Sequence, residues 1–214
     1  MPVILLNECQ CGVDATDLGF PHVLLCMAVV LQTNAYLYGM HFDSPPRTTE
    51  LADALLDFIQ RKGGNVANGV RLYGVCHHHN RNTNRAPPIP NNADTAWRNE
   101  MQLIAQRLNY HGPVTGFDTT IIDPAQGTYI EFRRATGQTR CRIFYKRHEK
   151  MTHNSPYVAA VNRPAPGSGN LNQWSVNNHA WMSPNPVTIS GDLGPNATTM
   201  HELNYFLRAT SFNV

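Results

Sequence analysis

Two stretches of the chain repeat apolar residues at the spacing of an α-helix. The first begins near Thr48 and ends at Lys62, where a cation in the last turn and a following glycine are typical of a helix C-terminus. The second begins at Asp94, the expected N-cap, and ends near Gly112. The pattern therefore predicts two amphipathic helices. Their apolar stripes are Leu51, Ala54, Leu55 and Ile59 in the first, and Trp97, Met101, Ile104, Ala105 and Leu108 in the second.

Strand patterns lie between and after these helices. Residues 70–75 alternate between apolar and polar side chains, which is typical of a half-buried strand. Residues 128–134 and 140–145 are joined by a glycine-containing connection, so they predict a β-hairpin. The polar, proline-bearing segment 77–92 is expected to be a long surface loop.

An earlier hairpin is predicted from two apolar runs. Residues 22–31 form a nearly continuous apolar strand pattern, and residues 36–42 form a second one. The four residues between them, Gln-Thr-Asn-Ala, are able to turn. The two strands should therefore pair antiparallel.

The loop length of this hairpin sets which residues face each other. A two-residue loop at 33–34, or a four-residue loop at 32–35, places Cys26 directly opposite His41. Opposed residues have Cβ atoms about 4.5–5.5 Å apart, within reach of a thiol-to-imidazole hydrogen bond. A loop of three or five residues would instead put the two side chains on opposite faces of the sheet.

Together these elements predict an α+β fold, an α/β sandwich of mixed or antiparallel sheet layers with two main helices packed on the sheet. We assign residues 1–147 to this domain. Residues 148–214 hold ten of the 21 asparagines and six of the 15 prolines, so we expect an irregular extension that packs on the same domain. Trp174 and Trp181 should pack back on the body, because large aromatic side chains are seldom left in water.

Charge and apolar content limit the partners. The 214 residues carry 17 cationic and 15 acidic side chains, and the net charge of +2 is too small for the field that nucleic acids or anionic membranes usually select. No apolar run approaches the roughly 20 residues that span a bilayer, and the run at residues 3–6 is too short for a secretory signal. We expect no nucleic-acid or membrane partner, and a chain that starts in the cytoplasm of the producing cell.

Cysteine and histidine content does not predict a metal centre. Five cysteines at irregular spacing leave at least one unpaired, which favours a reducing compartment. The run from Cys76 to His79 offers four ligand types, but adjacent residues cannot all converge on one tetrahedral ion, and Cys9 and Cys11 are too close together for the usual spacing. We therefore predict no metal and no cofactor.

Cys26 and His41 are the candidate catalytic pair. An imidazole near a thiol can stabilise the reactive thiolate and later return the proton to a departing amine. His22 shares a strand face with Cys26, but two strand steps separate them by about 13 Å, which is too far. The alternative interpretation is a small buried cysteine in an apolar strand, with a histidine that happens to flank the turn.

The order of elements adds a resemblance. Over residues 18–146 the chain resembles the CheD family of chemotaxis-receptor glutamine deamidases. The resemblance lies in the order of elements, which is LLCMAVVL, LYGMHF, the first helix, VRLYGV, the second helix and FDTTIIDPAQGTYIEFRRATGQTRCRIF. The resemblance implies a CheD-like sandwich that hydrolyses a glutamine side chain of a protein to glutamate and ammonia, with Cys26 as nucleophile and His41 as general base. Deamidating bacterial toxins, the cytotoxic necrotizing factors and a Burkholderia-type lethal factor, are similar at the Cys-then-His hairpin.

The chain also departs from the family. Leu24 and Leu25 precede the cysteine where the family has Gly-Ser, and Phe20 stands where the family has a threonine, so the oxyanion hole and a third catalytic residue are not assigned. The extension and the 77–92 segment have no family counterpart. We therefore expect a bacterial effector or toxin that deamidates a host protein, delivered without a signal peptide. The alternatives are a chemotaxis-receptor deamidase, a peptide or peptidoglycan hydrolase with the same pair, and a noncatalytic protein-binding module.

Overall fold

The computed structural model describes residues 3–89, 92–120, 122, 127–147, 172–182, 201–203 and 209–214. These residues form two sheets, three α-helices and two short 3₁₀ turns. The helices are α1 (Thr48–Arg61), α2 (His78–Thr83) and α3 (Ala93–Leu108). The strands are β1 (Ile4–Leu5), β2 (Gln10–Asp14), β3 (Asp17–Val23), β4 (Met27–Thr33), β5 (Leu37–Phe42), β6 (Gly69–Cys76), β7 (Pro113–Asp118), β8 (Thr128–Arg133), β9 (Arg142–Arg147), β10 (Gln173–Ser175), β11 (Ala180–Trp181), β12 (His201–Glu202) and β13 (Ala209–Asn213).

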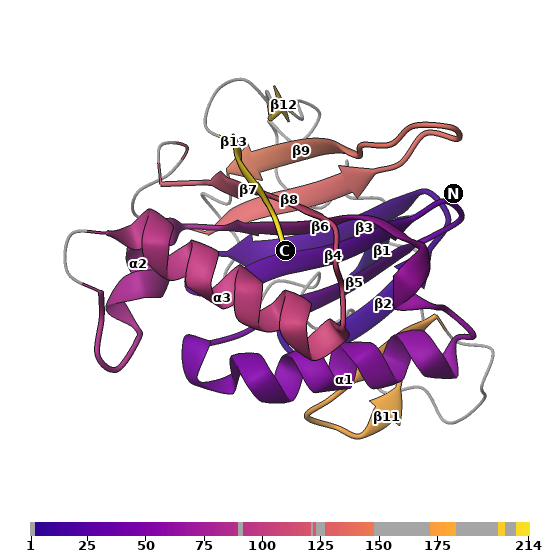
Figure 1. The fold of residues 1–214 in the computed structure, drawn as a ribbon, viewed down its shortest axis with the longest axis horizontal. Helices are drawn as coiled ribbons and strands as arrows, with labels where there is room; N and C mark the ends of the chain where they lie inside the picture. The colour runs from indigo at the N-terminus through magenta and orange to yellow at the C-terminus, as the bar shows by residue number, and fades with distance from the viewer. Residues whose placement is uncertain are drawn as a thin grey trace.

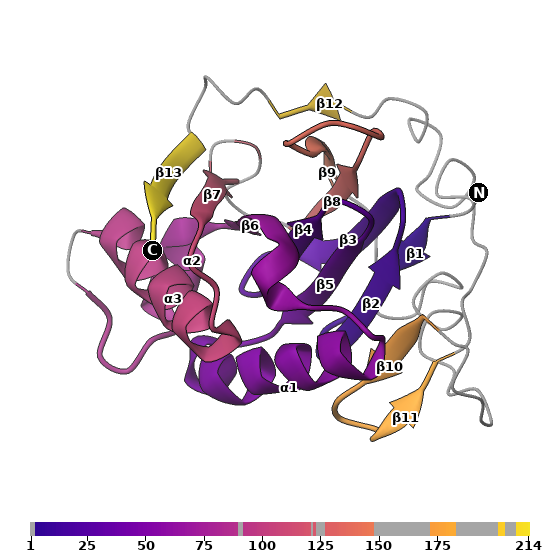
Figure 2. The ribbon, with the colours of Figure 1, turned by 45° about the vertical axis from the view of Figure 1, so that its right-hand side comes forward.

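The elements stack in three layers (Figures 1 and 2). One sheet has the strand order β11-β10-β2-β5-β4-β6-β7-β13, and the other has the order β1-β3-β8-β9-β12. Helices α1 and α3 cover one face of the larger sheet, and the smaller sheet covers its other face. Both sheets contain parallel and antiparallel pairs. The predicted α+β sandwich with two main helices is confirmed.

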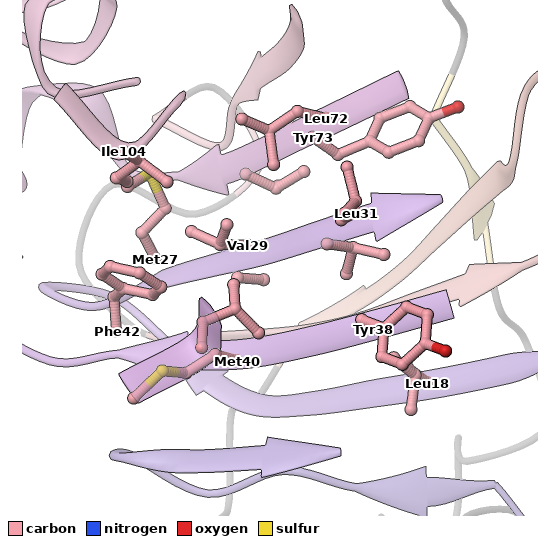
Figure 3. Close-up of a cluster of buried hydrophobic side chains, with 14 of the residues drawn as sticks. Leu18, Met27, Val29, Leu31, Tyr38, Met40, Phe42, Leu72, Tyr73 and Ile104 are labelled. Carbon is pink, nitrogen blue, oxygen red and sulfur yellow. The ribbon is translucent and has the colours of Figure 1, made fainter. Parts of the chain in front are cut away.

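Side chains of the larger sheet alternate between these two neighbours (Figure 3). Val29, Leu31, Tyr38 and Met40 point toward the helices, and all four are buried. On the other face, the backbone of Gly39 lies so close to the second sheet that an added Cβ would stand 2.7 Å from Leu18 Cδ1. Burial on both faces explains why β4 and β5 are apolar almost throughout.

Both predicted helices are present, with shifted ends. The first, α1, buries Leu51, Leu55, Phe58 and Ile59 against the sheet and ends at Arg61. The side chain of Asn92, and not Asp94, caps α3 by accepting the Thr95 N–H at 3.0 Å. Asn109 ends α3 in the left-handed conformation, with φ of 54°, so the helix stops before Gly112.

The early hairpin is confirmed as β4–β5, but the predicted strand at 22–31 is wrong. Pro21 has no N–H to donate, and His22 takes a left-handed φ of 58°, so the pairing of β3 with β8 shifts before Val23. Residues 24–26 are bends, and across them the chain passes from the smaller sheet into the larger one. The sequence pattern does not show this crossing, because Leu24 and the exposed Leu25 continue the apolar run through the link.

The predicted surface loop at 77–92 is also wrong in its first half. Residues His78–Thr83 form α2, and the ring of His77 caps it by accepting the Asn80 N–H at 3.1 Å. His78, Arg81 and Asn82 are buried in this helix. Their polarity gives no apolar stripe, so the sequence pattern indicates a loop although the segment is packed.

The hairpin of β8 and β9 is confirmed. The expectation of an irregular extension after residue 147 is wrong for its described residues, because β10 pairs with β2, β12 with β9 and β13 with β7, so the extension completes the edges of both sheets. Trp174 and Trp181 lie half-buried on the body, 5.2 Å apart in an edge-to-face pair, and the Trp181 ring centroid is 6.1 Å from that of Phe58. The apolar segment at 157–161 lies outside the described residues. No helix within the described part of the chain has the length and apolar content needed to cross a membrane.

Candidate active site

Cys26 lies in the bend that links the two sheets, directly before β4. The residue is 2% exposed, and its thiol donates a hydrogen bond to the backbone carbonyl of His22 at 3.3 Å. The neighbouring Leu25 is 43% exposed, so the thiol is one residue away from solvent. The nucleophile candidate is therefore buried, although the residue before it is exposed.

His41 lies near the end of β5, on the face that looks toward the smaller sheet. Its Nδ1 is 2.8 Å from the carbonyl oxygen of Leu6, and its ring packs edge-on against Phe20 with centroids 5.9 Å apart. A carbonyl only accepts, so Nδ1 carries the proton and Nε2 carries a lone pair. Nε2 is buried and has no hydrogen-bond partner among the described residues. This tautomer leaves Nε2 as a proton acceptor.

The register differs from the one predicted. The loop of the hairpin is Asn34–Ala35, because Thr33 and Tyr36 bond across it, so opposed residue numbers add to 69 and His41 lies opposite Ala28. The predicted direct opposition of Cys26 and His41 is wrong by two residues. Cys26 precedes Met27, the first paired residue of β4, so the predicted cross-strand pair of Cys26 and His41 is not formed.

Burial sets the protonation state of the thiol. It raises the pKa of Cys26 from the usual 9.0 to about 12, and the carboxylate of Glu8 raises it further. The backbone N–H groups of Leu24 and Cys26, and the cation of Arg81, act in the opposite direction. Two N–H groups beside one sulfur are the kind of donors that stabilise a thiolate or an oxyanion.

The imidazole is neutral for the same reason. Burial lowers the pKa of His41 from 6.5 to about 4, while Glu8 and the hydrogen bond to Leu6 raise it and the nearby His22 and Arg81 lower it. At neutral pH the described state therefore pairs a protonated thiol with a neutral imidazole. Glu8 and Arg81 act on both groups, which places the two groups in one electrostatic environment.

Arg81 is the residue that sequence reasoning missed. It is 1% exposed, and its guanidinium donates to the backbone carbonyls of Leu25, at 2.8 Å, and Asp43, at 2.6 Å. It also forms a two-pronged ion pair with Glu100, at 2.9 and 2.6 Å. Nothing in a polar run of sequence indicates that one of its arginines is buried. The burial of Arg81 follows from its pairing with Glu100 on α3, which only the structure shows.

Among the described residues, one cluster has ligand atoms close enough to hold a cation. His78, Asp94 and Asp118 each offer one atom within 4.8 Å of the others. The Nδ1 of His78 already bonds Asp94 at 2.7 Å, and the ring stacks on Trp97 with centroids 5.2 Å apart. Of the run from Cys76 to His79, the cluster includes His78 and none of the other three.

A cavity of about 390 Å³ lies between α2 and the start of α3. Its lining does not include Cys26 or His41. The lining residues are His79, Asn82, Thr83, Pro88, Ile89, Asn92 and Ala93. This hollow is therefore separate from the thiol and imidazole.

Comparison with known families found no family model that matches the chain, and no curated protein matches it either.

Proposed function

We propose that the chain is a cysteine-dependent protein glutamine deamidase, with Cys26 as nucleophile and His41 as general base. One observation carries the proposal: a buried imidazole presents an unpartnered Nε2 on the inter-sheet face, next to the bend that holds a cysteine. A buried polar atom without a partner costs free energy, so its presence calls for an explanation, and a catalytic role for Nε2 is one. The resemblance to the CheD family supports the choice of a carboxamide as substrate.

The reaction runs in two stages. The thiol proton passes to Nε2 of His41 as the sulfur of Cys26 attacks the glutamine carboxamide carbon, and the carbonyl oxygen becomes an oxyanion. The C–N bond breaks, the nitrogen takes the proton from Nε2, and ammonia leaves a thioester. Water then adds to the thioester with His41 as base, and glutamate and the free thiol are regenerated.

In this proposal the described structure corresponds to the resting enzyme. With Cys26 2% exposed, a glutamine side chain reaches the sulfur only after the residues that cover the thiol move aside. The charge of Glu8 raises the pKa of the Cys26 thiol and the N–H groups of Leu24 and Cys26 lower it, so the balance between them decides how readily the thiolate forms. Docking of a protein substrate supplies the binding energy for that movement, which makes the enzyme selective for its partner.

The protein substrate is either a bacterial protein or a host protein. In the second case the enzyme is an effector or toxin that enters the host cell by a route without a signal peptide. The CheD resemblance by itself favours a chemotaxis receptor. The departures at Leu24 and Leu25 favour a different partner, because these residues directly precede the nucleophile in the chain. We place the effector role first.

The test is proteome-wide mass spectrometry of bacterial and host cell extracts incubated with the full chain. We expect one glutamine to gain the mass that marks conversion to glutamate, with no such change for Cys26→Ala or His41→Asn. The matched control is Cys141→Ala, which removes another buried thiol beside Gln32, at the other end of the β4–β5 pair from His41, and leaves the conversion intact. Folded wild-type protein that converts no glutamine in any extract contradicts the proposal.

A second candidate function is a noncatalytic protein-binding module on the same fold. The burial of Cys26 and its thiol pKa of about 12 favour it, since an inert structural cysteine has the same properties. Cys26→Ser separates the two candidates. A module keeps its biological effect in this variant, whereas the enzyme loses it with the fold intact.

A further inference from the structure

Arg81 joins the two chain segments that carry the candidate catalytic pair. Its Nη1 donates to the carbonyl of Leu25, the residue before Cys26, and to the carbonyl of Asp43, two residues after His41. Both hydrogen bonds come from one nitrogen of one buried side chain. The bend between the sheets and the end of β5 are therefore tied to a common point.

The bond to Leu25 also fixes the amide of Cys26. A trans peptide is planar, and its N–H points opposite to its C=O, so a carbonyl held by Arg81 turns the Cys26 N–H away from the guanidinium. That same N–H lies close enough to the sulfur to lower the pKa of the Cys26 thiol, together with the N–H of Leu24. One arginine thus determines where a donor beside the nucleophile points.

The guanidinium is itself held rigidly. Glu100 on α3 binds its Nε and Nη2, and Glu100 is bound in turn by Arg85 and by the hydroxyl of Thr48. Burial disfavours the charged form of Glu100, but these partners hold the pKa of its carboxyl below the usual range, so the ion pair persists. An arginine suits this place because its planar fork binds a carboxylate with two nitrogens and still has donors for two carbonyls.

We infer that Arg81 is a positioning residue of the active site: it orients the Leu25–Cys26 peptide so that the Cys26 N–H serves as an oxyanion donor. The inference rests on the proposed deamidase function for its catalytic part. The substrate oxygen does not touch Arg81; it meets the amide that Arg81 aligns. The inference assigns an oxyanion donor to the chain. The sequence comparison left this donor unassigned, because Leu24 and Leu25 stand where the CheD family has Gly-Ser.

The chain offers a direct readout of this peptide. The Leu25–Cys26 bond is the one Leu–Cys peptide in the sequence, so protein made with carbonyl-13C leucine and 15N cysteine gives a single carbonyl-to-amide NMR correlation. The variants are Arg81→Lys, which keeps the charge, and the pair Arg81→Met with Glu100→Met, which removes both buried ions together. Arg107→Met is the matched control, because Arg107 pairs with Asp53 on the surface.

We expect the correlation to shift in both Arg81 variants and to stay in place in Arg107→Met. On the glutamine found by mass spectrometry, kcat falls about 10²–10³-fold, the usual cost of one oxyanion donor. KM changes less than about threefold, because substrate binding is not what is lost. Circular dichroism confirms the fold, and Arg81→Lys serves if the double variant does not fold.

An unmoved correlation in a folded Arg81 variant overturns the inference. A shifted correlation with unchanged kcat also overturns the inference about Arg81, but it leaves the proposed deamidase function in place. Wild-type protein that deamidates nothing overturns the proposed function and with it the catalytic part of this inference; a shifted correlation in that case shows Arg81 orienting the bend of a noncatalytic protein.

Discussion

His41 lies opposite Ala28 in the β4–β5 pair, and the two side chains share the face that looks toward the smaller sheet. Ala28 is fully buried and lies directly opposite His41 on this face. The size of residue 28 therefore limits the room beside the imidazole between the two sheets.

Ala28→Leu is expected to destabilise the protein by about 1–3 kcal/mol, because a close-packed interior does not accept three extra carbons without strain. Urea unfolding measures the loss. The control Ala67→Leu, at an exposed position, should change the free energy of unfolding by less than about 0.5 kcal/mol. An Ala28→Leu protein as stable as wild type would mean that residue 28 does not face a packed layer.

The stability of the protein should fall as pH drops from 6.5 to about 4 because of His41. Its pKa is about 4 in the folded state and 6.5 when exposed, so in this window the unfolded chain binds a proton that the folded chain does not. The contribution lost is about 3 kcal/mol once pH is below both values. Above about pH 7.5 the imidazole is neutral in both states and adds no pH dependence.

His41→Asn removes this part of the pH dependence and keeps a donor for the Leu6 carbonyl. Urea unfolding at intervals between pH 4 and 7 gives the slope of the unfolding free energy against pH for the wild type and for the variant. The buried carboxylates titrate in both proteins, so the difference between the slopes isolates the imidazole. Parallel slopes would show that the folded state binds a proton at His41 as easily as the unfolded state.

Glu100→Gln should destabilise the protein by about 3–5 kcal/mol, because it leaves the buried guanidinium of Arg81 without its counterion. Asp53→Asn breaks the exposed pair with Arg107 and should cost less than about 1 kcal/mol. Thermal and urea unfolding give both values. Equal losses would contradict the distinction between the buried pair and the surface pair.

Gly116→Ala should be far more damaging than Gly74→Ala. A Cβ at Gly116 would stand 1.9 Å from Trp97 and 2.6 Å from the backbone oxygen of Gly74, so a helix and a strand must shift. A Cβ at Gly74 meets the flexible side chain of Met101, which can rotate away. We expect a loss of more than about 3 kcal/mol for Gly116→Ala and about half of that for Gly74→Ala.

Sequence periodicity predicted the elements whose burial is apolar on one face. It found α1, α3 and the hairpins, and from them the sandwich, because each presents an unbroken apolar pattern to the core. It missed α2, whose buried members are His78, Arg81 and Asn82, since a polar side chain is buried only where a partner from elsewhere receives it.

The assignment of Cys26 and His41 as site residues stays a prediction, and the geometry expected between them is not the one observed. The parity of the β4–β5 pairing follows from any loop of even length, so the shared face of Ala28 and His41 could be predicted. The position of the turn could not, because Thr33 and Tyr36 close it through bonds of the Thr33 hydroxyl and backbone that composition does not specify. Arg81 was out of reach, since its partners come from three separate segments.

The bend at residues 24–26 belongs to neither strand ladder, so backbone pairing does not hold it in place. Strands within a sheet can separate only by giving up many backbone bonds together, whereas this short link is fastened to the body by the side chain of Arg81. Loss of that one side chain would therefore release the bend while both sheets stay paired.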